Sequence, residues 1–89
     1  MSIQSQTTRR FWRLFFDLPL EIKQEAKRAY RLFRAGPAHP GLHFKKLEGA
    51  SDIYSVRIGL DYRALAVMKG DRVVWYWIGG HSEYDRLVR

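Results

Sequence analysis

The first half of the chain shows the periodicity of amphipathic helices. In RRFWRLFFDL (residues 9–18) the four aromatic residues recur at helical spacing, and Thr7 or Thr8 is suited to cap the first turn. Between Pro19 and Gly36 an apolar stripe runs beside a stripe of Lys and Arg residues. Proline favours the start of a helix and glycine its end. The pattern therefore predicts two consecutive helices, the second ending before Gly36.

After the AGPAHPG segment the period changes to that of β-strands. Tyr54, Val56 and Ile58 alternate with polar residues and are expected to face the helices, while Leu42 and Phe44 are expected to share one face of an earlier strand. The KGDR sequence between the last two apolar runs predicts a tight hairpin. Four strands are predicted, in LHFKKL (42–47), IYSVRIG (53–59), YRALAVM (62–68) and VVWYWIG (73–79).

Short connections between these segments favour antiparallel neighbours, because parallel neighbours need long crossovers. The last strand is apolar on both faces, so it is expected to be central or covered by helices, with Trp75 and Trp77 in the core. Ser2–Thr7 is expected to add a short edge strand. The prediction is one α+β domain, residues 1–89, in which two N-terminal helices pack on one face of a three- to five-stranded, mainly antiparallel, twisted sheet.

Composition excludes several classes of protein. The chain has 89 residues and no cysteine, which rules out a disulfide framework and a Cys-based zinc site. No apolar run approaches the roughly 18 residues of a membrane span, and MSIQSQTTRR lacks the apolar core of a signal peptide. We therefore expect a soluble cytoplasmic protein that does not act at a membrane.

The net charge of +7 is concentrated in the first half of the sequence. Residues 1–46 contain ten Lys and Arg residues and three acids, whereas residues 47–89 contain six of each. A basic field of this kind attracts polyanions such as nucleic acid, an anionic membrane or an acidic protein. Charge alone does not choose among these partners.

The sheet face opposite the helices is the candidate site. If Tyr54 faces the helices, Arg57 faces away from them, and Lys45, Arg63, His81 and Tyr84 can join Arg57 on that face. Such a cluster suits phosphate. It contains no paired carboxylates, no Ser or Cys nucleophile and no glycine-rich phosphate loop. The chemistry that fits is metal-independent cleavage of RNA, in which the 2′-hydroxyl is itself the nucleophile and the protein supplies acid, base and positive charge.

The segment HPGLHFKKLEGASDIYSVRIGLDYRALAVMKGDRVVWYWIGGHSEYDRL resembles the RelE/ParE superfamily of bacterial toxins. The matching features, in order, are Pro and Gly-Leu before FKKLEG, then IYSVRIGLDYRALA, then GD, then an apolar strand ending in IGGH before a tyrosine. With the preceding helices the resemblance covers roughly residues 8–87. It implies a RelE-like fold and the toxin of a type II toxin–antitoxin module, silenced by a cognate antitoxin.

The RelE-like branch of this superfamily cleaves mRNA in the ribosomal A site and uses neither a metal nor another cofactor. By position, the resemblance implies that Arg63 binds the scissile phosphate and that His81 and Tyr84 carry the proton transfers. Contacts to rRNA are also expected. The resemblance further implies a substrate-binding role for the basic residues Lys45, Lys46 and, by a looser match, Arg57.

Two other functions remain open from the sequence. The ParE branch shares the scaffold and inhibits DNA gyrase without being an enzyme, and a non-catalytic RNA- or ribosome-binding domain would have the same charge. Individual residues also have structural interpretations. His81 can be a hydrogen-bonded residue after a strand, Tyr84 can cap the core, and Arg63 can pair with Asp61 or Asp85.

Overall fold

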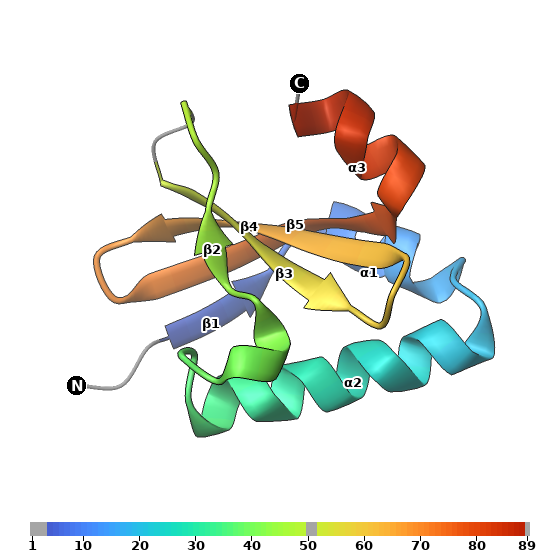
Figure 1. Ribbon diagram of the computed structural model, residues 1–89, viewed down its shortest axis with the longest axis horizontal. Helices are drawn as coiled ribbons and strands as arrows, with labels where there is room; N and C mark the ends of the chain where they lie inside the picture. The colour runs from blue at the N-terminus through green and yellow to red at the C-terminus, as the bar shows by residue number, and fades with distance from the viewer. Residues whose placement is uncertain (1–3, 50–51, 89) are drawn as a thin grey trace.

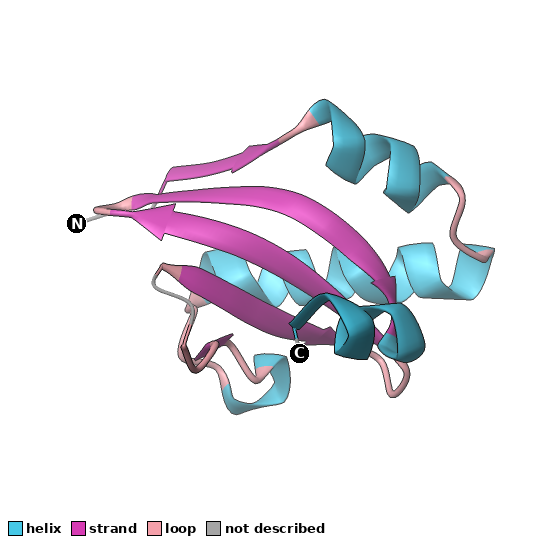
Figure 2. Ribbon diagram, turned by 90° about the horizontal axis from the view of Figure 1, so that it is seen from above, coloured by secondary structure: helices cyan, strands magenta, loops and turns pink. Residues whose placement is uncertain are grey.

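The computed structural model describes residues 4–49 and 52–88, which form a five-stranded sheet with helices on both faces (Figures 1 and 2). The strands lie in the order β1-β5-β4-β3-β2, with β1 parallel to β5 and the other neighbours antiparallel. No helix in these residues is long and apolar enough to span a bilayer. Along the chain the elements are β1 (Gln4–Thr7), α1 (Arg9–Phe16), α2 (Leu20–Ala35), the 3₁₀ helix η1 (Pro40–Leu42), β2 (Lys45–Lys46), β3 (Ile53–Ile58), β4 (Tyr62–Lys69), β5 (Arg72–Gly80) and α3 (His81–Val88).

The two N-terminal helices form as the sequence predicts. Thr8 caps α1, and its Oγ1 accepts a hydrogen bond from the Phe11 N–H at 3.1 Å. Helix α2 begins directly after Pro19 and ends where the Gly36 N–H donates to the Leu32 carbonyl oxygen. Local capping interactions and backbone preferences thus determine where α1 begins and where α2 begins and ends.

The predicted strand at residues 42–47 is wrong over most of its length. Leu42 belongs to η1, and β2 contains only Lys45 and Lys46. Pro40 favours a turn by fixing its own φ, and His43 adopts a left-handed conformation (φ 51°) that breaks an extended chain. The other three predicted strands form. Of the edge strand predicted at residues 2–7, residues 4–7 form β1, and residues 2 and 3 lie outside the described residues.

The main core lies between the sheet and helices α1 and α2. As expected, Val56 and Ile58 face these helices, each 3% exposed. The rings of Phe33 and Trp75 meet edge to face with their centroids 5.3 Å apart. Leu42 is fully buried, so η1 closes this core although it does not extend the sheet.

A β-bulge in β5 places its two tryptophans on opposite faces of the sheet. Trp75 is opposite Ala66 and Trp77 is opposite Leu65, so Tyr76 between them has no partner on β4. Trp75 therefore joins the core under the helices, whereas Trp77 packs on the other face; both are buried, as predicted. The strand is apolar on both faces because both faces carry buried side chains.

Helix α3 covers part of the second face of the sheet, which the sequence analysis left uncovered (Figures 1 and 2). The His81 N–H at its start donates to the Asp61 carbonyl oxygen at 2.7 Å, which ties the helix to the β3–β4 turn. It contacts β4 and β5. The sequence gives little warning of α3, because its only aliphatic residues, Leu87 and Val88, lie together at its end and are exposed.

The close approach of Trp77 to Gly79 predicts a large effect of a single methyl group. A Cβ atom at Gly79 would lie 2.6 Å from Cζ2 of the buried Trp77 ring. We expect Gly79→Ala to lower the free energy of unfolding by about 1–3 kcal/mol, the usual cost of overpacking. The matched control is Gly36→Ala, because nothing lies within 4 Å of a Cβ there. Urea denaturation measures both, and equal stabilities of the two variants would contradict the packing described here.

Candidate functional site

The candidate site lies on the sheet face that carries α3. On this face the register forms two cross-strand rows, because residues directly opposite each other point the same way. One row contains Arg57, Arg63 and Gly79, and the next contains Lys45, Ser55, Leu65 and Trp77. Two arginines therefore stand side by side at the end of the sheet where α3 begins.

Arg63, His81 and Tyr84 come together at the start of α3. The guanidinium carbon of Arg63 lies 5.6 Å from the centroid of the Tyr84 ring, within the range of a cation–π contact. The His81 ring stacks on the Tyr84 ring with centroids 6.2 Å apart, and the Trp77 ring lies 6.5 Å from Tyr84 on the sheet side. The three residues predicted to be catalytic therefore form one cluster.

His81 is paired with an acid that the sequence analysis had placed elsewhere. Its Nε2 lies 3.3 Å from Oδ2 of Asp85, one helical turn further along α3, and both side chains are about half exposed. The sequence also allows Asp85 to pair with Arg63. Within residues 4–49 and 52–88, Arg63 has no ion pair, with Asp61 or with Asp85. The spacing of four residues would have indicated the His81–Asp85 pair if a helix had been predicted here.

Arg57 stands beside Arg63, but its side chain turns toward the β3–β4 turn. Its Nε donates to the Gly59 carbonyl oxygen at 3.2 Å. The side chain also lines a groove of about 500 Å³ together with Arg28 and His43. Arg57 therefore adds charge near the cluster without joining the contacts around Tyr84.

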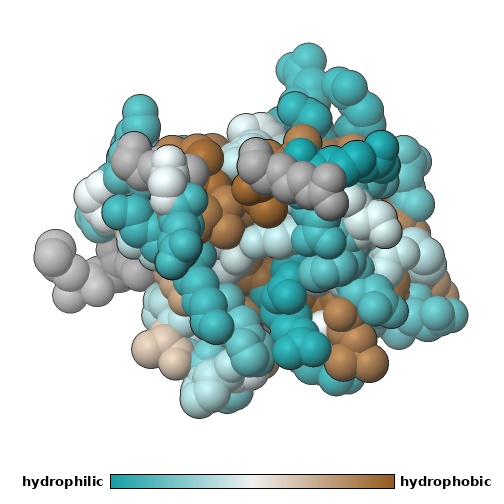
Figure 3. Space-filling model, turned by 45° about the horizontal axis from the view of Figure 1, so that its top comes forward, coloured by the Kyte–Doolittle hydropathy of each residue, from teal (hydrophilic) through white to brown (hydrophobic). Residues whose placement is uncertain are grey.

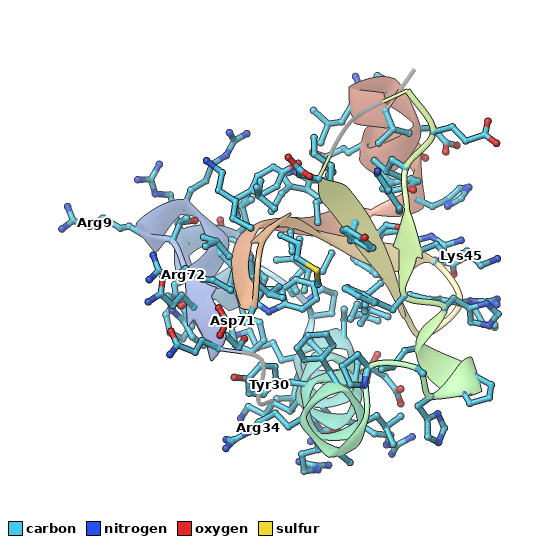
Figure 4. All side chains as sticks on the ribbon, turned by 90° about the vertical axis from the view of Figure 1, so that its left-hand side faces the viewer. Arg9, Tyr30, Arg34, Lys45, Asp71 and Arg72 are labelled. Carbon is cyan, nitrogen blue, oxygen red and sulfur yellow. The ribbon has the colours of Figure 1, made fainter. Side chains whose placement is uncertain are left out.

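The two lysines of β2 lie on different faces of the sheet. Lys45 is opposite Ser55 on the face of the candidate site, and Figure 4 shows its side chain extending outward from β2. Lys46 is opposite Tyr54, whose ring stacks on Phe44 with centroids 4.9 Å apart on the helix side. The prediction that both lysines flank the same substrate is therefore not matched by the geometry: only Lys45 shares a face with the cluster.

A second hollow on this face, which we name the Tyr76 pocket, was not predicted. It has a volume of about 440 Å³ and lies between the bulge of β5, the start of β3 and the end of α3. Figure 3 shows hydrophobic surface gathered in the upper middle of this face. The lining includes Leu65, Tyr76, Trp77 and Leu87, with Arg10 reaching in from α1. Burial raises the pKa of Tyr76, and the charge of Arg10 opposes that rise.

An apolar groove of about 430 Å³ lies on the other side of the molecule, between β1, α1 and α2. Its wall includes Trp12, which is 43% exposed, and Tyr30, which is 40% exposed. Lys27 and Arg31 stand along its α2 side. In Figure 4 the labelled Arg9 and Arg34 project from α1 and α2 around this region. The positive charge of the N-terminal half therefore surrounds an exposed apolar surface.

Comparison with known proteins identifies relatives of this chain. Residues 20–86 match the family described as the ParE-like toxin domain. No curated protein sequence matches the chain.

Similar folds are found among solved toxin structures. A chain of the RelB–RelE antitoxin–toxin complex from Methanococcus jannaschii superposes with a TM-score of 0.77 at 16% identity, covering 94% of this chain and 99% of that one. A mutant E. coli RelE toxin in the free state gives 0.72 at 16% identity, covering 96% and 90%. The YoeB/ParE toxin from Agrobacterium tumefaciens gives 0.70 at 15% identity, covering 89% and 99%. The RelE-like fold class is thereby confirmed.

The environment of Tyr76 predicts a measurable titration. Removing the charge in Arg10→Ala should raise the pKa of Tyr76 further, because a nearby cation favours the phenolate. Phenolate absorbance against pH measures this value, and Tyr76→Phe identifies the Tyr76 signal among the five tyrosines. The raised pKa also means that stability should decline above about pH 10, where the unfolded chain ionises first. An unchanged or lower pKa in Arg10→Ala would place Arg10 away from the phenol.

Proposed function

Because this chain belongs to the family of ParE-like toxin domains, we propose that it is the toxin of a toxin–antitoxin module and an endoribonuclease. Its substrate in this proposal is mRNA on the ribosome, and its effect is to inhibit translation. The observation that supports cleavage is the joint placement of Arg63, His81 and Tyr84. A phosphate ligand, an imidazole and a phenol on one face supply the three functions that RNA cleavage needs.

In the proposed reaction His81 takes the proton from the 2′-hydroxyl of the nucleotide before the cut. The 2′-oxygen attacks the phosphorus, so a new P–O bond forms as the bond from phosphorus to the 5′-oxygen breaks. Tyr84 gives its proton to that leaving oxygen. The products are a 2′,3′-cyclic phosphate and a 5′-hydroxyl. Each proposed step uses only protein side chains and the 2′-hydroxyl of the substrate.

Arg63 holds the scissile phosphate in this mechanism. Its guanidinium carbon lies 5.6 Å from the centroid of the Tyr84 ring, and a guanidinium can donate its N–H groups to two non-bridging oxygens of a phosphate. Negative charge develops on these oxygens in the transition state, where a fixed cation stabilises it most. The contact with Tyr84 also keeps the phosphate ligand close to the proton donor.

Asp85 has a supporting role in the proposal. Its carboxylate lies 3.3 Å from His81 Nε2, where it stabilises the imidazolium that forms when His81 accepts a proton. The same contact engages Nε2, so Nδ1 is the ring nitrogen left to face the substrate. Asp85 therefore acts by positioning His81 and not by touching the RNA.

The remaining basic residues supply longer-range attraction. Lys45, Lys46 and Arg57 are separated from the cluster by register or by side-chain direction, so we assign them to the general binding of mRNA and rRNA backbones. This part of the binding should weaken as salt rises, because phosphate contacts release counterions.

A cognate antitoxin is the proposed protein partner. Similar structures from Methanococcus jannaschii, Pyrococcus horikoshii and E. coli are described as complexes of RelE with RelB. The apolar groove with Lys27 and Arg31 at its side suits an amphipathic segment that carries acidic residues. A bound antitoxin would cover the exposed ring of Trp12.

The alternative is a non-enzymatic inhibitor of DNA gyrase, which the ParE-like description of the family favours. Such a toxin would need neither His81 nor Tyr84 for a proton transfer. A non-catalytic RNA-binding domain would likewise bind without cutting. Substitution of the cluster separates these functions from the proposed ribonuclease.

We expect substitution of the cluster to abolish cleavage while the fold is kept. His81→Ala and Tyr84→Phe should each lower the single-turnover rate on ribosome-bound mRNA by about 10²–10⁴-fold. Arg63→Ala should lower it by about 10²–10³-fold, the usual effect of losing one transition-state donor. Circular dichroism and thermal unfolding would verify that each variant is folded.

Matched controls on the far side of the molecule are Arg72→Ala and Tyr30→Phe, which remove the same groups at exposed positions outside the cluster. Both should cleave at the wild-type rate. If all three cluster variants remained toxic in cells, the mechanism would be wrong. Toxicity with intact mRNA and a supercoiling defect would favour the gyrase alternative.

A further inference from the structure

The Tyr76 pocket is next to the candidate site. Trp77 belongs to both: its ring lies 6.5 Å from that of Tyr84, and it also lines the pocket. Along β4, Leu65 in the pocket is two residues from Arg63 and points to the same face of the sheet, so the pocket adjoins the position of the proposed phosphate ligand. An RNA strand held at Arg63 would therefore bring a neighbouring nucleotide to the pocket.

The lining of the pocket suits a flat ring with a polar edge. Trp77 and Leu65 form an apolar floor, and Leu87 on α3 forms an apolar side. The lining also includes three residues that carry polar groups, Tyr76, Arg10 and Glu48. At about 440 Å³ the hollow has the size of a small-molecule site.

A wholly apolar side chain from a protein partner suits this pocket less well. It would cover the guanidinium of Arg10 and the hydroxyl of Tyr76 without giving either a hydrogen-bond partner, which is costly. A nucleobase offers two apolar faces for the floor and wall, and donors and acceptors along its edge. The positive charge of Arg10 would also attract the phosphate group of that nucleotide.

The bulge in β5 brings Trp77 to the same face as Tyr76. In a regular strand Trp75 and Trp77 would share the helix face, and Tyr76 alone would point to the opposite one. The bulge instead turns Trp77 to the side of the candidate site, where Tyr76 and Trp77 both line the pocket. Bulges are common where a strand redirects a side chain next to a functional site.

We propose that the Tyr76 pocket holds one unstacked nucleobase of the RNA strand, beside the phosphate bound by Arg63. The inference rests on the proposed function, which it deepens by giving the toxin a means of reading one base. A base that fills the pocket and satisfies Arg10, Tyr76 and Glu48 is preferred over the others. Cleavage therefore shows a base preference at one position next to the cut.

The first test measures binding without cleavage. The four nucleoside 3′-monophosphates are titrated separately into the full chain and followed by NMR. The signals of Tyr76, Trp77 and Leu87 should shift, and the affinities should differ among the bases. Tyr76→Ala should weaken binding by about fivefold or more, because it removes the hydroxyl that the edge of the base would contact. Tyr30→Ala, an exposed tyrosine in the other groove, should bind like the wild type.

A second variant keeps the test decisive if Tyr76→Ala fails to fold. Val88 is partly exposed at the edge of the pocket, so Val88→Trp should fill the pocket without disturbing the core, and it should block binding of every nucleotide. If no nucleotide shifts the pocket signals, or if Val88→Trp binds all four like the wild type, the inference is overturned.

The second test maps mRNA 5′ ends after brief induction. The wild type should show enrichment of one base at a fixed position next to the cut, and Val88→Trp should lose this enrichment. Cleavage without any such preference would overturn the inference but not the proposed ribonuclease. Conversely, nucleotide binding in the pocket of a protein that cuts no mRNA would support the pocket and overturn the ribonuclease.

Discussion

The packing of the Trp77 ring over Gly79 is the contact on which the candidate site depends. A ring can lie within 3 Å of a would-be Cβ only because residue 79 is glycine. In this position Trp77 gives α3 an aromatic surface, and Tyr84 of α3 lies against it. The second attachment is the backbone hydrogen bond from His81 to Asp61. Together they fix a short helix that has little apolar surface of its own.

The attachment of α3 determines which side chains meet on this face of the sheet. Holding α3 over β4 and β5 brings Tyr84 over Arg63 and leaves the His81–Asp85 pair half exposed at the rim. The bulge in β5 separates this surface from the main core, since it sends Trp75 to one face and Trp77 to the other. Tyr76, the unpaired residue of the bulge, and Trp77 both line the Tyr76 pocket. One face of the sheet thus brings together an arginine, a tyrosine, a histidine–aspartate pair and a pocket, the groups on which the proposed RNA cleavage and base binding rest.

The sequence predicted the parts of the fold that depend on local chemistry. Thr8, Pro19 and Gly36 bound the helices through their own backbone and side-chain preferences, and alternation placed Val56 on the correct face. Tertiary effects were missed. A strand is expected at residues 42–47, but the turn at Pro40 and the left-handed conformation of His43 interrupt it. Helix α3 was not predicted, because it is stabilised by contacts with the sheet and has no apolar stripe in its own sequence. The side-chain direction of Arg57 and the bulge at Tyr76 likewise depend on three-dimensional packing.

The central claim is that this face cleaves RNA through its own side chains and the 2′-hydroxyl of the substrate. The most direct measurement is the end-group chemistry of mRNA recovered from purified bacterial ribosomes after incubation with the toxin. The account predicts new fragments that carry a 2′,3′-cyclic phosphate on one side of the cut and a 5′-hydroxyl on the other. Fragments with a 3′-hydroxyl and a 5′-phosphate, or mRNA that stays intact on the ribosome, would contradict it.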